Sequence, residues 1–360
     1  MRFAILGTRG IPARYGGFET FAEELSRRLV ARGHRVRVYC RSRYEGGNQY
    51  EGVDLCYLPT IRHKYFDTIA HTFLSTLHLL LHRVDAALYC NGANAIFTPL
   101  PRLTGMPVAL NVDGLERLRK KWNRVAKSWY HLSEWLATFC PNVVVTDAER
   151  IQQYYLERYK KRSVFIPYGA ETGKIPSRRI LQTLGLQPGR YFLYVSRMEP
   201  ENNALMVREA FERTNVDFKL ALVGDAPYAS DYIRRVRDTR DPRILFPGAI
   251  YGEGYKELLS HCFAYIHATE VGGTHPALIE AMGRGALTLY YDVPENAETA
   301  GDAGIPFRED LVEKIEAVAR MNDAERNEYS RRAEQRVRER YGWDAVTDAY
   351  EELLLSLAGR

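Results

Sequence analysis

The sequence predicts an α/β protein built from two doubly wound parallel sheets. Short apolar runs of strand length alternate with longer stretches of helical periodicity, which is typical of parallel strands joined by crossover helices. The alternation continues to about residue 168 and begins again near residue 191. A chain of 360 residues suits two domains of ordinary size. Residues 172–188 have weak periodicity, so we expect the linker there.

The first half begins with an apolar strand at 2–6, a glycine-rich loop at 7–17 and an amphipathic helix at 18–31. A long helix is expected at 66–82. The remaining strands expected in this half are 36–40, 53–58, 86–90, 107–112, 142–146 and 164–169. We therefore assign a first domain to residues 1–168.

The second half repeats the order of strand, loop and helix. Its expected strands are 191–196, 218–224, 243–248, 262–267 and 286–291. Two charged helices are expected at about 309–340 and 343–357. The second domain is therefore assigned to residues 169–342.

The composition is that of a globular protein, with 46% apolar and 26% charged residues. The most apolar stretch, 69–81, is too short to span a bilayer and contains His71 and His78. The chain starts on an apolar strand without the pattern of a signal peptide. Its five cysteines show no CxxC spacing, which favours reduced thiols and a cytoplasmic location.

Charge is divided unevenly along the chain. Residues 1–168 hold 25 Lys and Arg against 14 Asp and Glu, a net charge of +11, whereas residues 169–360 hold 25 against 31, a net charge of −6. A basic half indicates an anionic surface or a polyanionic partner.

The stretch 266–286 carries the most distinctive motif, a strand followed by a glycine loop and a helix. The loop contains Gly272, Gly273, Thr274 and His275, and a proline follows where the first helical turn begins. Free backbone N–H groups at such a helix start can bind an anion. Glu280 lies one turn inside the helix, where it can reach hydroxyls of a ligand. An ordinary connecting turn with a surface glutamate is an equally good interpretation of this stretch alone.

The loop after the first strand has four glycines but lacks the spacing of a dinucleotide fingerprint. It ends in Gly16 and Gly17 at a helix start, and Arg9 and Arg14 supply positive charge. We favour a functional loop that closes on phosphates or on an acceptor over a plain connection.

Arg197 follows the first strand of the second half, at the edge of the sheet where doubly wound folds bind ligands. A guanidinium there can hold a diphosphate through two hydrogen bonds. A surface ion pair at the strand end is the alternative.

Asp113 and Glu116 follow a buried strand of the first half. Two carboxylates at a strand end can act in acid–base catalysis or hold sugar hydroxyls. They can equally well cap a helix. The chain has no Asp-x-Asp, HExxH, GxSxG or Walker motif, so no bound metal and no cofactor are expected.

These motifs together resemble glycosyltransferase family 4, whose members are two-domain retaining enzymes of the GT-B fold. The closest similarity is to the bacterial capsule and cell-wall rhamnosyltransferases. The matching segments are GTRGIPARYGGFETFAEEL, HTFLSTLH, NVDGLE, PYGAE, SRMEPENN, VGGTHPALIEAM and DVPENAETAGDAG, in order along nearly the whole chain. The resemblance implies two Rossmann-like domains facing across a cleft, with the last helix (343–360) crossing back to the first domain.

The resemblance also implies roles for individual residues. The first domain would bind the acceptor and the second the nucleotide-sugar donor. Arg197 would contact the donor diphosphate, and Glu280 would hold the ribose as the second glutamate of the family's Glu–seven residues–Glu motif. Asp113 falls where many members have a histidine at the donor sugar. Gly16 and Gly17 would lie near the phosphates, and the loop 272–275 would surround the diphosphate and donor sugar.

Two departures from the family pattern stand at donor-binding positions. Asn202 replaces a common lysine, which removes one countercharge to the phosphates. Gly272 stands where the first glutamate of the motif is expected, and Glu270 is two residues too early. Since that glutamate reads donor-sugar hydroxyls, an ordinary hexose donor becomes doubtful. Both departures resemble the rhamnosyltransferase subgroup, whose donor would be dTDP-L-rhamnose.

The expected function is metal-independent, retaining transfer of L-rhamnose to a lipid-diphosphate-linked saccharide in cell-surface polysaccharide synthesis. A UDP- or GDP-sugar transferase, a nucleotide-sugar 2-epimerase and a non-catalytic sugar-nucleotide-binding protein remain alternatives.

A basic and aromatic stretch, 117–130, suggests where the enzyme works. Basic side chains beside Trp and Tyr suit an anionic bilayer surface. We expect a peripheral protein on the cytoplasmic leaflet, with Arg9, Arg14, Lys120, Lys121, Arg124 and Lys127 on the acceptor or membrane side. A solvated helix face is the alternative, and no nucleic-acid partner is expected.

Overall fold

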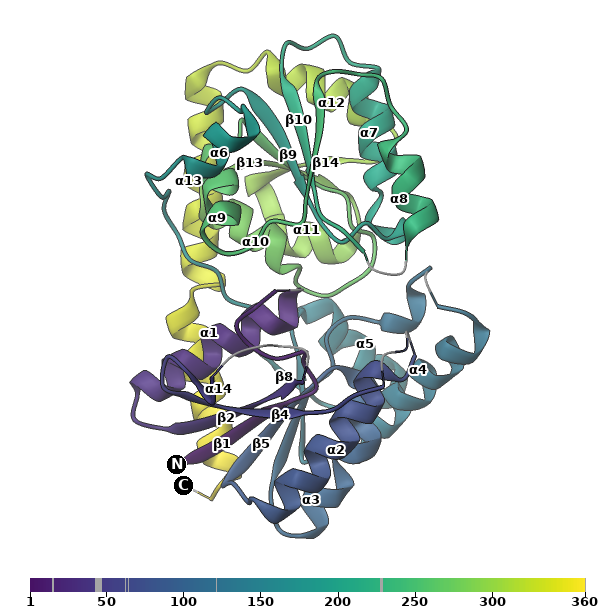
Figure 1. Cartoon of the computed structure of the whole chain (residues 1–360), viewed down its shortest axis with the longest axis vertical. Coiled ribbons are helices and arrows are strands. Elements are labelled where there is room, and N and C mark those ends of the chain that lie inside the picture. Colours follow the sequence, from purple (N-terminus) through teal and green to yellow (C-terminus); the bar gives the residue numbers. More distant parts are fainter. Residues whose placement is uncertain are drawn as a thin grey trace. The chain divides into compact units, whose positions relative to one another are not determined.

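The computed structural model describes residues 1–14, 16–42, 47–61, 63, 65–120, 122–226 and 229–359. The chain divides into two compact units (Figure 1). The first unit comprises Met1–Tyr168 together with Trp343–Arg360, and the second comprises Gly169–Gly342. Each unit is built on its own sheet, so the predicted α/β class with two doubly wound sheets is confirmed.

The first unit contains an eight-stranded sheet of order β3-β4-β2-β1-β5-β6-β7-β8, in which only the pairing of β3 with β4 is antiparallel. In that spatial order the strands are Gln49–Tyr50, Val53–Leu58, Arg35–Arg41, Arg2–Leu6, Ala86–Cys90, Val108–Asn111, Val143–Thr146 and Val164–Phe165. The helical segments of this unit are α1 (Gly17–Ala31), α2 (Asp67–Leu81), η1 (Gly92–Phe97), α3 (Pro99–Leu103), η2 (Glu116–Leu118), α4 (Arg124–Ala137), α5 (Glu149–Tyr159) and α14 (Trp343–Leu357).

The strand order reverses direction between β1 and β5. The chain moves one way from β1 to β2 and the other way from β4 to β5, so right-handed crossovers place α1 and α2 on opposite faces of the sheet. The helices between β5, β6 and β7 continue in the second direction and share the face that α2 covers. The last helix, α14, packs on α1 and therefore covers the other face.

The second unit contains a parallel six-stranded sheet of order β11-β10-β9-β12-β13-β14. In that order the strands are Ile244–Gly248, Lys219–Val223, Tyr191–Val195, Ala264–His267, Leu287–Tyr291 and Gly304–Phe307. The helical segments are α6 (Arg179–Leu184), η3 (Pro200–Asn202), α7 (Ala204–Glu212), α8 (Ser230–Arg237), α9 (Gly252–His261), α10 (Pro276–Gly283), α11 (Pro294–Ala300), η4 (Gly301–Ala303), α12 (Leu311–Ala319) and α13 (Asp323–Arg340).

The strands of the second sheet are buried on both faces, as parallel strands between helix layers must be. On β9, Phe192 and Tyr194 pack into one core while Tyr191 and Leu193 pack into the other. This two-sided burial explains why the strands read as continuous apolar runs in the sequence.

The structure differs from the sequence expectation near the C-terminus. The helix expected at 309–340 is two helices, α12 and α13, because Asn322 caps the second one. Its side chain accepts from the backbone N–H of Glu325, and the Glu325 side chain accepts from the N–H of Asn322. This capping box starts a new helix. The expected linker region also contains the short helix α6.

Candidate functional site

In each unit the residues of interest follow the carboxyl ends of parallel strands, the edge where doubly wound sheets bind ligands. In the second unit they follow β9 and β12, which are neighbours in the sheet. In the first unit they follow β1 and β6, on either side of β5.

The glycine loop between β12 and α10 is closely packed. Gly272, Gly273 and Thr274 are buried, and Pro276 is the first residue of α10. A Cβ atom on Gly272 would lie 2.1 Å from Nε2 of His275, so the imidazole fills the space that any side chain at 272 would need. The family's glutamate cannot be accommodated at this position while His275 keeps its place.

His275 is fixed by a buried asparagine that the sequence analysis did not identify. The Asn296 amide nitrogen donates to the backbone carbonyls of Thr269 and Tyr291, at 2.9 and 2.8 Å. Its oxygen therefore faces Nδ1 of His275 at 2.8 Å, which assigns a proton to that nitrogen. Asn296 is fully buried and belongs to the segment DVPENAETAGDAG. Little in the sequence signalled this role, because α11 contains other polar residues, PENAETA.

Glu280 lies half-buried on α10, and its carboxylate accepts a hydrogen bond of 2.6 Å from the hydroxyl of Tyr255 on α9. Burial, together with the nearby charge of Glu280, raises the pKa of Tyr255 well above its ordinary value. The tyrosine therefore remains a donor over the physiological pH range and fixes the orientation of the carboxylate.

Arg197 follows β9, and its side chain is 29% exposed, with its guanidinium 3.9 Å from Glu199. Its backbone carbonyl accepts a 2.7 Å hydrogen bond from the side-chain amide of Asn202. Asn202 is buried and turned toward the loop backbone, so it shapes the loop that carries Arg197. A direct contact between Asn202 and a donor, which the sequence suggested, is not favoured by this geometry.

The two loops of the second unit are tied together. The Asn203 side-chain amide donates to the carbonyl of Ala268 and to the Glu270 carboxylate, both at 2.9 Å. The backbone N–H of Glu270 donates to the carbonyl of Glu201 at 3.0 Å. Glu270 is therefore part of the connection between loops and does not replace the glutamate missing at 272.

The glycine loop of the first unit, between β1 and α1, is held by carboxylates of the helix that follows it. Glu19 accepts from the backbone N–H of Arg9 at 2.8 Å, and Glu23 accepts from that of Ala13 at 2.5 Å. The carbonyl of Gly16 caps the start of α1, and Gly17 is its first residue. These bonds give the long loop a defined path.

The two arginines of this loop have different surroundings. Arg14 is exposed. The Arg9 guanidinium lies 3.8 Å from the buried carboxylate of Asp67, which also pairs with Arg41 at 2.5 Å. Both guanidinium groups therefore contact the same carboxylate near the end of β2.

Asp113 follows β6 with a backbone φ of +58°, a left-handed conformation that few residues other than glycine adopt. Its N–H donates to the side-chain oxygen of Asn111 at 3.0 Å, and the Tyr168 hydroxyl donates to its carboxylate at 3.4 Å. The Asn111 amide nitrogen donates in turn to the hydroxyl of Tyr350 at 2.8 Å. Asn111 and Tyr350 are fully buried, so the last helix of the chain supports the strained turn at Asp113.

Glu116 is not brought together with Asp113 as an acid–base pair by any contact described here. Its carboxylate accepts from the guanidinium of Arg119 and, at 3.1 Å, from the indole of Trp122. These bonds stabilise the turn η2, which agrees with the structural alternative considered for this residue.

The basic stretch after η2 is only partly on the surface. Arg117 pairs with Glu134 and donates to the Tyr154 hydroxyl, and Arg119 is buried. Lys120, Arg124 and Lys127 are exposed. Lys121 lies outside the described residues.

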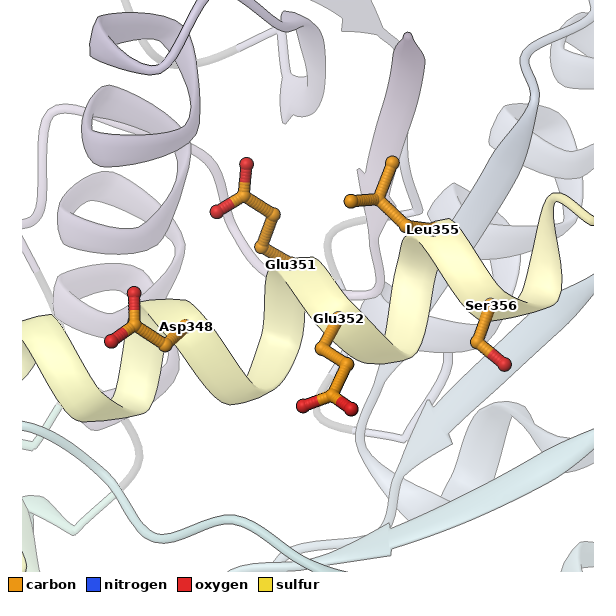
Figure 2. Close-up of a pocket in the computed structure, with 5 residues that line it drawn as sticks. All are labelled: Asp348, Glu351, Glu352, Leu355 and Ser356. Carbon is orange, nitrogen blue, oxygen red and sulfur yellow. The ribbon is translucent and has the colours of Figure 1, made fainter. Parts of the chain in front are cut away.

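A shallow hollow on α14 is lined by Asp348, Glu351, Glu352, Leu355 and Ser356 (Figure 2). Two of its carboxylates pair with Arg32 and His34, just before β2 begins. The hollow therefore lies toward the amino ends of the strands, away from the glycine loops, and it is not the candidate active site.

Residues 15–174 match the model described as Glycosyltransferase Family 4, and residues 189–322 match the model described as Glycosyl transferases group 1. The chain is thus similar to glycosyltransferases of these two types over most of its length. Each match falls within one of the two compact units, apart from the first few residues after Tyr168.

Among known proteins, YqgM of Bacillus subtilis (strain 168), an uncharacterised glycosyltransferase, is 27% identical over 203 residues. The match covers 53% of this chain and 53% of YqgM, so the chain spans about half the length of that relative.

Two solved structures resemble the whole chain. HepE of Anabaena, solved in complex with UDP-glucose, has a TM-score of 0.79 at 16% identity, covering 99% of this chain and 100% of HepE. An α,α-trehalose-phosphate synthase from Burkholderia xenovorans, solved with glucose-6-phosphate, has a TM-score of 0.75 at 12% identity with the same coverage. These likenesses and the two parallel-dominated sheets confirm the expected GT-B fold.

The described residues contain neither a cluster of three or more His, Cys, Asp or Glu side chains placed to hold a metal ion nor a helix long and apolar enough to cross a bilayer.

The support of Asp113 by α14 can be tested through stability. Tyr350→Phe leaves the buried amide of Asn111 without its acceptor and should lower the free energy of unfolding by about 1–3 kcal/mol. Tyr89→Phe is the matched control, because its partner Thr76 keeps a second bond to the carbonyl of Thr72 and should lose less. Urea unfolding of both variants measures the difference, and equal losses would contradict the proposed support.

The position of Glu280 predicts an effect on nucleotide binding. Glu280→Ala removes a charged acceptor at the start of α10 and should weaken the binding of the donor nucleotide by about 1–3 kcal/mol. Titration calorimetry with nucleoside diphosphates measures the change, with Glu253→Ala on α9 as a control for loss of an exposed carboxylate. Unchanged affinity in a folded Glu280→Ala protein would refute the role.

Arg197 should bear much of the diphosphate charge because Asn202 supplies none. Arg197→Lys keeps the charge but loses the planar fork that binds two oxygens at once, so turnover should fall clearly. Arg190→Lys, at an exposed ion pair with Asp217, is the matched control. Initial rates of nucleotide release measure the effect, and a lysine as active as the arginine would argue against two-oxygen clamping.

Proposed function

We propose that the protein is a retaining glycosyltransferase that transfers L-rhamnose from dTDP-L-rhamnose to a lipid-diphosphate-linked saccharide in cell-surface polysaccharide synthesis. The observation that carries the donor assignment is the packing of His275 against Gly272. It removes the carboxylate that would read the hydroxyls of a common hexose. The second unit binds the donor and the first unit binds the acceptor.

The second unit's residues suit a nucleoside-diphosphate sugar. Arg197 and the N-terminus of α10 supply positive charge for a diphosphate. Glu280, oriented by Tyr255, accepts hydrogen bonds from the ribose hydroxyls. The loop from Gly272 to His275 presents backbone N–H groups to the phosphates and packs closely around the sugar.

The reaction breaks the bond between the sugar C1 and the diphosphate oxygen and joins C1 to the acceptor oxygen. The acceptor proton passes to the departing diphosphate, so no enzymic nucleophile is required. The protein's task is to stabilise the leaving group and a sugar with oxocarbenium character and to exclude water. We assign Asp113 as the catalytic carboxylate of the first unit, since its strained backbone is held by several partners. Glu116 stabilises the following turn, η2, through Arg119 and Trp122.

Two alternatives have specific support. HepE was solved with UDP-glucose, which keeps a UDP-sugar donor open, although an identity of 16% carries the fold alone. The missing charge at Asn202 and the missing glutamate at 272 keep a non-catalytic sugar-nucleotide-binding protein open. An epimerase would convert the donor without any acceptor.

The acceptor places the proposed enzyme on the cytoplasmic leaflet of the plasma membrane. Exposed Lys120, Arg124 and Lys127 add positive charge to the acceptor unit. These groups suit the diphosphate of a lipid-linked sugar.

A thermal-shift panel of nucleotide sugars, run in excess EDTA, tests the donor assignment. A ligand at about 100 times its Kd adds about 2.7 kcal/mol of apparent stability. The largest shift should come from dTDP-L-rhamnose, with smaller shifts from UDP-glucose and GDP-mannose. A larger shift with UDP-glucose would overturn the donor assignment. In an assay of transfer, activity that EDTA abolishes and Mg²⁺ restores would overturn metal independence. Epimerised donor without acceptor would favour the epimerase.

A further inference from the structure

Helix α2 of the first unit buries its polar side and exposes its apolar side. Its buried residues are mostly polar, namely Asp67, His71, Thr72, Ser75, Thr76 and Leu79. Its exposed side carries Phe73, Leu77 and Leu81, spaced four residues apart, with exposed fractions of 43, 41 and 82%. A surface helix of a soluble protein normally shows the reverse.

Several polar side chains on the inner side of α2 are bonded within the protein. Ser75 and Thr76 donate to carbonyls one turn earlier, and the Thr76 hydroxyl also bonds the buried Tyr89 hydroxyl at 2.9 Å. Asp67 is held by Arg41. These contacts fix the rotation of α2 about its own axis. The apolar side is on the surface because the polar side makes the contacts inside.

The apolar surface continues onto the neighbouring helices that share this face of the sheet. Phe73 contacts Phe97 of η1 with ring centroids 6.0 Å apart, and Arg102 of α3 donates to the carbonyl of Phe139 beyond α4. We call the combined surface the α2–α4 face (Figure 1). Its exposed members are Phe66, Phe73, Leu77, Leu81, Ile96, Leu100, Leu103, Leu132, Trp135 and Phe139.

The distribution of exposed apolar side chains is uneven. Of the 16 large apolar side chains that are exposed among the described residues, 15 belong to the first unit and only Tyr251 to the second. A contiguous surface of this kind marks an interaction site.

The charge of the first unit indicates what this surface contacts. Including α14, the unit holds 26 Lys and Arg against 18 Asp and Glu, a net charge of +8. Exposed Arg83, Arg102, Arg124 and Lys127 lie at the ends of the helices that form the face. An apolar centre with a Trp and a basic margin is complementary to an anionic bilayer, with its apolar interior and charged headgroups.

We propose that the first unit lies on an anionic bilayer with the α2–α4 face inserted at the boundary between headgroups and acyl chains. This rests on the proposed function only in that a lipid-linked acceptor must be reached at a membrane. Insertion, and not charge alone, holds the protein, because Arg117 and Arg119 of the basic stretch are engaged internally.

The test separates apolar contact from charge. Full-length protein is sedimented with vesicles of phosphatidylglycerol and phosphatidylcholine at low and high salt. Leu81→Ser/Leu103→Ser leaves the charge unchanged, and both residues are more than four-fifths exposed, so folding should be preserved. This variant should bind about tenfold or more weakly at both salt concentrations, since burial of a leucine contributes about 1.5–3 kcal/mol.

Two control variants accompany it. Lys120→Gln/Lys127→Gln should weaken binding at low salt only, because salt already screens these charges at high concentration. Ser356→Glu, on α14 at the other face of the sheet, should bind as the wild type does. Wild-type binding by the double serine variant, or complete loss of wild-type binding at high salt, would overturn insertion.

Trp135, which is 51% exposed, is one of four tryptophans, so its signal is taken as the difference between the wild type and Trp135→Phe. On vesicles the wild-type emission should shift to the blue and be quenched by brominated acyl chains, and both effects should be clearly smaller in Trp135→Phe. A concentration-dependent dimer without lipid, abolished by the serine variant, would instead assign the face to a second copy of the chain. None of these measurements involves sugar transfer, so the membrane proposal and the proposed reaction can fail independently.

Discussion

The arrangement of the donor loop depends on one buried amide, that of Asn296. Its nitrogen is committed to two backbone carbonyls, so its oxygen accepts from Nδ1 of His275 and holds the imidazole in place. The imidazole then occupies the space above Gly272. The position of His275 and the closed space at Gly272 therefore both depend on a residue more than twenty positions away, near the start of α11. Replacing the glycine alone cannot recreate the usual family motif, because the obstacle is the histidine.

The same logic applies in the first unit, where backbone strain and buried hydrogen bonds occur together. The left-handed turn at Asp113 carries a modest cost in free energy. Asn111 offsets this cost by accepting from the Asp113 N–H, and Tyr350 fixes the Asn111 amide in the orientation that makes this possible. The Phe21 ring packs against both Tyr168 and Tyr350, at 5.4 and 5.1 Å between centroids. The return of α14 to the first unit is thus connected to a candidate catalytic position as well as to the core.

Sequence reasoning predicted the fold because apolar alternation is a local property. The strands at 191–196 and 262–267 appear as β9 and β12 within a residue or two at either end. The short edge strands β3 and β14 were missed, since two to four residues carry little periodicity.

Side-chain partners could not be predicted in the same way. Nothing in the residues around Glu280 identifies Tyr255 as its donor, and the spacing of Asp113 and Glu116 suggested a pair that the bonds of Glu116 to Arg119 and Trp122 do not support. Such partners depend on which helix faces come together, and that is decided by topology.

Helix α2 shows most clearly what the sequence leaves undecided. Residues 69–81 are apolar enough to be considered for a bilayer span and too short to form one, and the helical periodicity alone does not say which side faces the protein. Hydropathy favours burial of Phe73, Leu77 and Leu81. The fold places the opposite side inward, where Asp67 and Thr68 bond Arg41 and Thr76 bonds Tyr89. Once those polar contacts fix the rotation of the helix, the apolar side is exposed by geometry. An apolar side that the fold holds in water gains free energy by contact with another apolar phase, which is the physical reason to propose a membrane beside this unit.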